Sequence, residues 1–225
     1  MKKNTTIDGV EILRFISAFA ILVWHYQHFN YPITNEIKIN QPLYRYLKFF
    51  YVYGYMGVYF FWCISGFIFF WKYGDKIKEL SFKIFFIARF SRLYPLHFLT
   101  LLLVLIFQNI FFSLNNDFFI VKNNDFYHFF LQIFMASNWG FENGTSFNGV
   151  IWSISIEILI YGVFFLILNF FKKNLIINFF IVAICILFKF IYEHNTSLII
   201  DCALFFFIGG SVIFLIEKFE RKKLN

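Results

Sequence analysis

Charged side chains are scarce in this sequence. Only 15% of its 225 residues are Asp, Glu, Lys or Arg, whereas 60% are hydrophobic. A soluble domain of this length carries far more charge to cover its surface. The composition therefore excludes a soluble globular protein.

Cysteine is also rare, with three residues in the chain. Cys63, Cys185 and Cys202 lie inside apolar stretches and show no CxxC spacing, so we interpret them as small core residues rather than metal ligands or disulfide partners. The net charge is +7, but no basic stripe with interleaved aromatic residues and no nucleic-acid motif is present. We therefore expect no metal site and no nucleic-acid partner.

Six apolar blocks of about 20 residues run through the chain, and this is the length that crosses about 30 Å of hydrocarbon. A span exposed to lipid must be helical, because a helix satisfies its own backbone hydrogen bonds. The sequence thus predicts an all-α polytopic bundle that forms a single transmembrane domain over residues 1–225. The expected spans are approximately 9–30, 52–72, 93–113, 149–171, 174–192 and 198–217.

Basic residues cluster at alternate ends of these blocks. They occupy the start of the chain, the segment 72–92, the pair Lys172 and Lys173, and the segment 218–223. Cytoplasmic loops of membrane proteins carry an excess of Lys and Arg, so the pattern predicts that both termini are cytoplasmic. The first block carries Glu11, Arg14 and His25 and lacks a small-residue cleavage site, so we expect no cleavable signal peptide.

Two connecting segments are more than short loops. Residues 76–92 alternate basic and apolar side chains, which predicts an amphipathic helix on the cytoplasmic surface. Residues 126–139 are partly apolar but too short to span, which predicts an interfacial or re-entrant segment.

The first block carries ionisable side chains that are costly in a membrane and are therefore functional candidates. Arg14 and His25 are eleven residues apart, which on a helix is about 1100°, close to three full turns. They should share one face, about 16 Å apart along the axis, with His28 one turn further. This face could form a polar track, or Arg14 could reach the headgroups while the histidines sit at the outer interface.

The fourth block contains Ser153, Glu157 and Tyr161 at helical spacing on one face. Glu157 is predicted to lie about 10 Å below the outer surface, near the depth inferred for His25. A carboxylate at that depth needs a partner, and His25 is a suitable one. The pair could serve catalysis or simply hold two helices together.

Arg89 and Arg92 are spaced for one face of a helix beside the cytoplasmic surface. Their guanidinium groups could grip a phosphate. They could equally mark the cytoplasmic end of the third span, which is the commoner use of such a pair.

Four segments, taken together and in order, resemble the acyltransferase type 3 family. The opening helix has an arginine, ten residues and a histidine, and the next segment is similar to the family's FFxxSGF motif. The third resembles its RxxR segment ahead of a proline, and the fourth its WSLSxE motif followed by an aromatic residue. The segments are residues 13–25 (LRFISAFAILVWH), 57–67 (GVYFFWCISGF), 88–95 (ARFSRLYP) and 152–157 (WSISIE) with Tyr161.

This resemblance implies an enzyme that moves an acyl group, commonly acetyl from acetyl-coenzyme A, onto a hydroxyl of a cell-surface carbohydrate or similar acceptor. By position, His25 is the catalytic histidine, Arg14, Arg89 and Arg92 are its basic companions, and Glu157 matches the acidic position. Acetyl-CoA is a co-substrate, and no permanently bound cofactor is expected. The implied location is the inner (cytoplasmic) membrane of a bacterium.

The resemblance leads to a mechanistic hypothesis. His25 acts as a general base on the acceptor hydroxyl, Glu157 fixes its tautomer, and Arg89 and Arg92 hold the phosphates of coenzyme A. A covalent acyl-histidine intermediate is an open alternative.

Family members usually have further C-terminal helices. Either this is a compact form, or a partner chain or second copy supplies them, or the chain is an inactive, truncated remnant. A transporter or flippase that uses the intramembrane His, Arg and Glu is a further alternative. It is less favoured because inverted repeats and helices broken by Gly or Pro are lacking.

Overall fold

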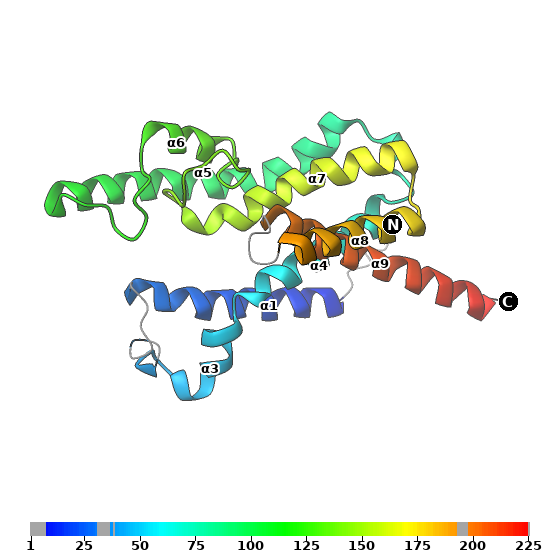
Figure 1. Cartoon of the computed structure of the whole chain (residues 1–225), viewed down its shortest axis with the longest axis horizontal. Coiled ribbons are helices and arrows are strands. Elements are labelled where there is room, and N and C mark those ends of the chain that lie inside the picture. The colour runs from blue at the N-terminus through cyan, green and yellow to red at the C-terminus, as the bar shows by residue number, and fades with distance from the viewer. Residues whose placement is uncertain (1–7, 31–36, 38, 193–197, 225) are drawn as a thin grey trace, which may run out of the picture.

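The computed structural model describes residues 8–30, 37, 39–192 and 198–224, and within these ranges every regular element is helical (Figure 1). Among these described residues, six helices are long and apolar enough to cross a membrane, as predicted. The helices in chain order are α1 (Asp8–Tyr26), η1 (Gln27–Asn30), α3 (Tyr44–Tyr53), α4 (Met56–Tyr73), η2 (Ile77–Glu79), α5 (Phe82–Asn115), α6 (Phe126–Ile133), η3 (Gly149–Ile151), α7 (Trp152–Phe171), α8 (Leu175–Tyr192) and α9 (Leu198–Leu224).

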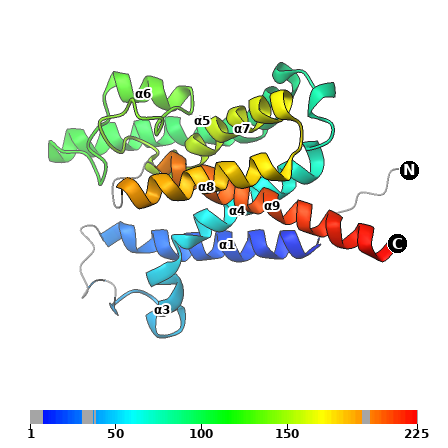
Figure 2. The same cartoon turned by 45° about the vertical axis from the view of Figure 1, so that its right-hand side comes forward.

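The long helices run antiparallel along the long axis of the molecule, so that the basic segments share one end. The start of α1 and the last turns of α9 lie together at the right-hand end in Figures 1 and 2, with the α4–α5 and α7–α8 connections. Lys173 of the α7–α8 connection is almost fully buried there and pairs with Asp75 and with Glu217. We call this the basic end; its cytoplasmic location stays a prediction from its charge.

Helices α4 and α9 cross at the centre of the bundle with their backbones in close contact. A Cβ atom added to Gly66 would lie 1.8 Å from the carbonyl oxygen of Phe206, and one added to Gly209 would lie 1.8 Å from that of Cys63. Small residues permit this approach, which is the usual way for helices to associate in a membrane. Aromatic side chains surround the crossing, among them Trp62, Phe69, Phe70, Phe164, Phe206 and Phe207.

The third span differs from its prediction. One helix of 34 residues, α5, runs from Phe82 to Asn115, so the later part of the expected surface helix, residues 82–92, is continuous with the span, and η2 precedes it. Ser81 starts the helix by accepting a hydrogen bond of 3.3 Å from the backbone N–H of Ile84. Pro95 lies inside it without ending it, which neighbouring groups in membrane bundles allow. At about 51 Å, α5 exceeds the thickness of the hydrocarbon core.

Two further helices, α3 and α6, differ in detail from the prediction. A separate helix, α3, precedes α4 and packs against α1, whereas the sequence predicted the second span to begin near residue 52. The segment predicted to be interfacial or re-entrant forms α6 followed by a turn in which Met135, Ala136 and Ser137 are buried. This turn carries the chain into the protein before α7 begins.

Candidate active site

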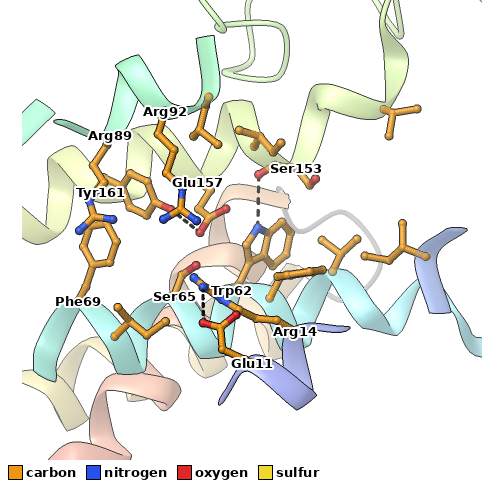
Figure 3. A pocket seen from close by; sticks show the side chains of 17 residues that line it. Glu11, Arg14, Trp62, Ser65, Phe69, Arg89, Arg92, Ser153, Glu157 and Tyr161 are labelled. Atoms are coloured by element: carbon orange, nitrogen blue, oxygen red, sulfur yellow. Dashed lines mark hydrogen bonds and ion pairs between the residues drawn. The ribbon is translucent and has the colours of Figure 1, made fainter. Parts of the chain in front are cut away.

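A cavity of about 540 Å³ lies between α1, α4, α5 and α7 (Figure 3). Three of its lining residues are arginines: Arg14 from α1, and Arg89 and Arg92 from α5. Glu157 and Tyr161 of α7 line it as well, so we call it the arginine cavity. Its other lining residues are Glu11, Ile21, Val58, Phe61, Trp62, Ser65, Ile68, Phe69, Leu93, Val150, Ser153 and Ile154.

Each arginine is held in a different way. Arg14 forms an ion pair of 3.1 Å with Glu11, one turn earlier on α1. The guanidinium of Arg89 lies 4.5 Å from the ring centre of Phe69, donates a hydrogen bond to the Tyr73 hydroxyl, and leaves its buried Nε without a partner among the described residues. In Figure 3 the Arg92 side chain points into the same space. The aromatic support fixes the plane of Arg89 and leaves part of its donor set free.

Glu157 belongs to this arginine cavity. The hydroxyl of Tyr161 donates a hydrogen bond of 2.6 Å to its Oε1 atom, and Ser65 of α4 lies beside both groups. Arg14 and Arg89 are close enough to interact with the carboxylate electrostatically. Glu157 therefore partly balances the positive charge that Arg14 and Arg89 bring into the cavity.

A second cavity of about 690 Å³ lies toward the other end of the same helices. His25 and His28 line it, so we call it the histidine cavity. The segments before α6 and before α7 complete its wall. Its remaining lining residues are Trp24, Phe29, Val104, Gln108, Phe119, Ile120, Val121, Lys122, Asn123, Thr145, Phe147, Asn148, Gly149, Val150 and Trp152.

The tautomer of His25 is set by the backbone of its own helix. Its Nδ1 atom lies 2.9 Å from the carbonyl oxygen of Ile21. A carbonyl oxygen only accepts hydrogen bonds, so Nδ1 carries the proton and donates it. The Nε2 atom of neutral His25 is then left with a lone pair that can take a proton.

The two cavities adjoin each other. Val150 lines both, and Ile21, one turn before His25, lines the arginine cavity. Between them, Trp62 packs edge-on against Trp152 with 5.8 Å between ring centres, and Trp62 donates a hydrogen bond of 3.3 Å to the carbonyl oxygen of Ser153. The predicted shared face of Arg14 and His25 therefore borders two cavities in succession.

The predicted pairing of Glu157 with His25 is wrong: among the described residues no hydrogen bond or ion pair joins them, since Tyr161 donates to Glu157 and Nδ1 of His25 faces the carbonyl oxygen of Ile21. The prediction placed the start of the fourth span at the outer surface. In the structure Glu157 lines the arginine cavity beside Arg14, whereas His25 lines the histidine cavity. Glu157 thus reaches the level of Arg14, and the carbonyl of Ile21 takes over the role in setting the tautomer that was assigned to Glu157.

Sequence reasoning missed three contributors to this site. Trp62 separates the cavities, Tyr73 holds Arg89, and the backbone carbonyl of Ile21 orients His25. Trp62 lies within the segment 57–67 that resembles a family motif, which was a usable signal. No comparable sequence motif marks Tyr73 or Ile21.

Comparison with known proteins places the chain in a class of enzymes. A family described as an acyltransferase domain matches residues 7–225, which is nearly the whole chain. The chain belongs to this acyltransferase type 3 family, and its six long apolar helices make it a multi-pass membrane protein of that family. No curated protein and no solved structure matches it.

Proposed function

We propose that this protein transfers an acyl group, most simply acetyl, from acyl-coenzyme A to a hydroxyl of a carbohydrate at the cell surface. The observation that carries the proposal is the pair of adjoining cavities, one lined by Arg14, Arg89 and Arg92 and the other by His25. One cavity suits an anionic donor, and the other offers a base to a hydroxyl acceptor.

The donor is assigned to the arginine cavity on chemical grounds. Coenzyme A carries phosphates, and guanidinium groups match phosphate oxygens in charge and geometry. The cavity lies on the side of the basic end, which is predicted to face the cytoplasm, where coenzyme A is found. From there the acyl end of the donor reaches toward Ile21 and Val150, where the second cavity begins.

The transfer itself is assigned to the histidine cavity. The acceptor hydroxyl gives its proton to Nε2 of His25 as its oxygen attacks the thioester carbonyl. The new C–O bond forms, the C–S bond breaks, and the proton passes from His25 to the departing thiolate. Ile21 stabilises the imidazolium that forms in between, because Nδ1–H still donates to its carbonyl oxygen. An ester and free coenzyme A result.

The proposed location is the inner membrane of a bacterium, with the carbohydrate acceptor on the side opposite the donor. This arrangement follows from the order of the cavities along α1, from Arg14 to His25, combined with the predicted topology.

The test is transfer from radiolabelled acetyl-CoA in membranes that contain the protein. We expect label in the glycan fraction with the wild-type chain and none above background with His25→Ala, at equal amounts of inserted protein. Full activity of His25→Ala would overturn the assignment of the base. Movement of a substrate across the membrane without acyl transfer would support the transporter alternative instead.

A further inference from the structure

His28 lies one turn beyond His25 and borders the same cavity. The two imidazole rings have their centres 5.5 Å apart. Trp24 packs against both of them, with ring centres 4.8 Å from His25 and 4.5 Å from His28. The indole therefore holds the two rings as a pair at the wall of the histidine cavity.

The surroundings of His28 place its proton on the opposite nitrogen from that of His25. Its Nδ1 atom is buried and has no hydrogen-bond partner in the part of the chain that the structure describes. A buried N–H without an acceptor is rarer in proteins than an unsatisfied acceptor, so Nδ1 holds the lone pair and Nε2 holds the proton. His28 lines the histidine cavity, and Nε2 is the ring nitrogen that is not among its buried atoms without a partner.

The two rings thus present complementary groups to an acceptor molecule. His25 offers a lone pair on Nε2, because its Nδ1–H donates to Ile21. His28 offers an N–H donor. A hydroxyl that donates to His25 can have a second oxygen on the neighbouring carbon that accepts from His28.

The rest of this wall is mainly apolar, with a few polar side chains and no unpaired charge among the described residues that line it. Asn123, Thr145 and Asn148 line it, and the ammonium group of Lys122 lies 2.5 Å from a carboxylate oxygen of Asp117. A neutral molecule rich in hydroxyl groups suits such a lining better than an anion does.

We infer that His28 is a specificity-determining residue that selects an acceptor with two oxygens on adjacent carbons, as in the vicinal diols of sugars. The inference rests on the proposed function and deepens it. In this arrangement His25 takes the proton from the reacting hydroxyl, while His28 donates to its neighbour and fixes which oxygen faces the base.

The test compares two small acceptors, cis-1,2-cyclohexanediol and cyclohexanol, with the purified full chain in vesicles. Ester formation from acetyl-CoA gives kcat/KM for each alcohol. We expect the wild-type chain to prefer the diol by about tenfold, the effect of one well-placed hydrogen bond. His28→Ala should abolish this preference, so that the two alcohols have equal kcat/KM values. His28→Gln keeps a donor near the position of Nε2 and should retain part of the preference.

Several outcomes would overturn the inference. An equal loss for both alcohols in His28→Ala would mean that His28 supports the fold around His25 and does not select the acceptor. A wild-type chain without a preference for the diol would contradict it as well. So would acetylation of the glycan fraction without acetylation of either alcohol. Absence of transfer to both alcohols and to the glycan fraction would refute the proposed function itself.

Discussion

Tyr161 lies one turn beyond Glu157 on α7 and donates a hydrogen bond of 2.6 Å to its carboxylate. This contact satisfies the acidic group within its own helix and leaves it facing Arg14 and Arg89. Glu157 therefore contributes its charge to the proposed donor cavity. The tautomer of His25 is set by the backbone carbonyl of Ile21.

Arg89 provides a direct test of the donor cavity. Arg89→Lys keeps the charge but loses the planar group that stacks on Phe69 and the fork that fits a phosphate. We expect the Kd for coenzyme A, measured by titration calorimetry, to rise about tenfold, in the range of one charge-assisted hydrogen bond.

Lys78→Gln is the matched control for Arg89→Lys. Lys78 is exposed near the same end of the molecule and is not among the residues that line the arginine cavity. Its removal should change the Kd by less than about twofold at physiological salt, because exposed charges are screened. A rise in Kd for Lys78→Gln with none for Arg89→Lys, which keeps its charge, would show that coenzyme A responds only to the general positive charge of this end.

Substitution of Gly66 tests the close backbone contact at the crossing of α4 and α9. Gly66→Ala places a methyl group against the backbone of Phe206, so the helices must move apart. We expect a loss of about 2 kcal/mol in unfolding free energy, typical of overpacking, seen as a lower thermal midpoint in detergent.

Gly162→Ala is the control for this prediction. In the part of the chain that the structure describes, no atom beyond the adjacent residues and backbone of its own helix, α7, lies within 4 Å of a Cβ added to Gly162. Alanine favours a helix by about 1 kcal/mol over glycine, so this variant should be as stable as the wild type or slightly more so. If both variants behaved alike, the close crossing would be wrong.

Substitution of Asp125 tests the N-terminal cap of α6. The backbone N–H of His128 donates to its carboxylate at 2.9 Å, and this bond holds the pKa of Asp125 below its ordinary value. The contribution to stability is thus complete above the pKa of the unfolded chain, about 3.9, and disappears as the pH falls through the lower folded pKa.

Hydrogen exchange of the α6 amides measures this effect. We expect Asp125→Ala to lower their protection by about 1 kcal/mol at neutral pH, as the loss of an N-cap does. Asp125→Asn keeps a capping oxygen but does not titrate, so its protection should depend less on acidity. A wild-type chain and an Asp125→Asn variant with the same acid dependence would contradict the capping role.

The transmembrane architecture could be predicted from the sequence because helices exposed to lipid consist mainly of apolar residues. Blocks of apolar residues give the six spans, and helical periodicity places Arg14 and His25 on one face, which borders the two cavities. Both features depend on local geometry alone. The continuity of residues 82–92 with the third span was missed because their alternating basic and apolar side chains indicate a surface helix, and the apolar block begins only at residue 93.

The relative depth of residues on different helices was beyond sequence reasoning. Glu157 and His25 were predicted to meet because both spans were assumed to begin at the membrane surface. Which residues of two helices lie side by side depends on tertiary packing, and the packing places Glu157 beside Arg14 in the arginine cavity. The same holds for Tyr73 and Ile21, whose contacts with Arg89 and His25 are visible only once the chain is folded.

The central claim is that donor and acceptor approach the reaction from opposite sides of the membrane through the two cavities. It is tested most directly with sealed vesicles of opposite orientation, to which labelled acetyl-CoA is added from outside. We predict acetylation of the enclosed glycan in inside-out vesicles, none in right-side-out vesicles, and none in inside-out vesicles with His25→Ala. Equal labelling in both orientations of intact vesicles would contradict the account.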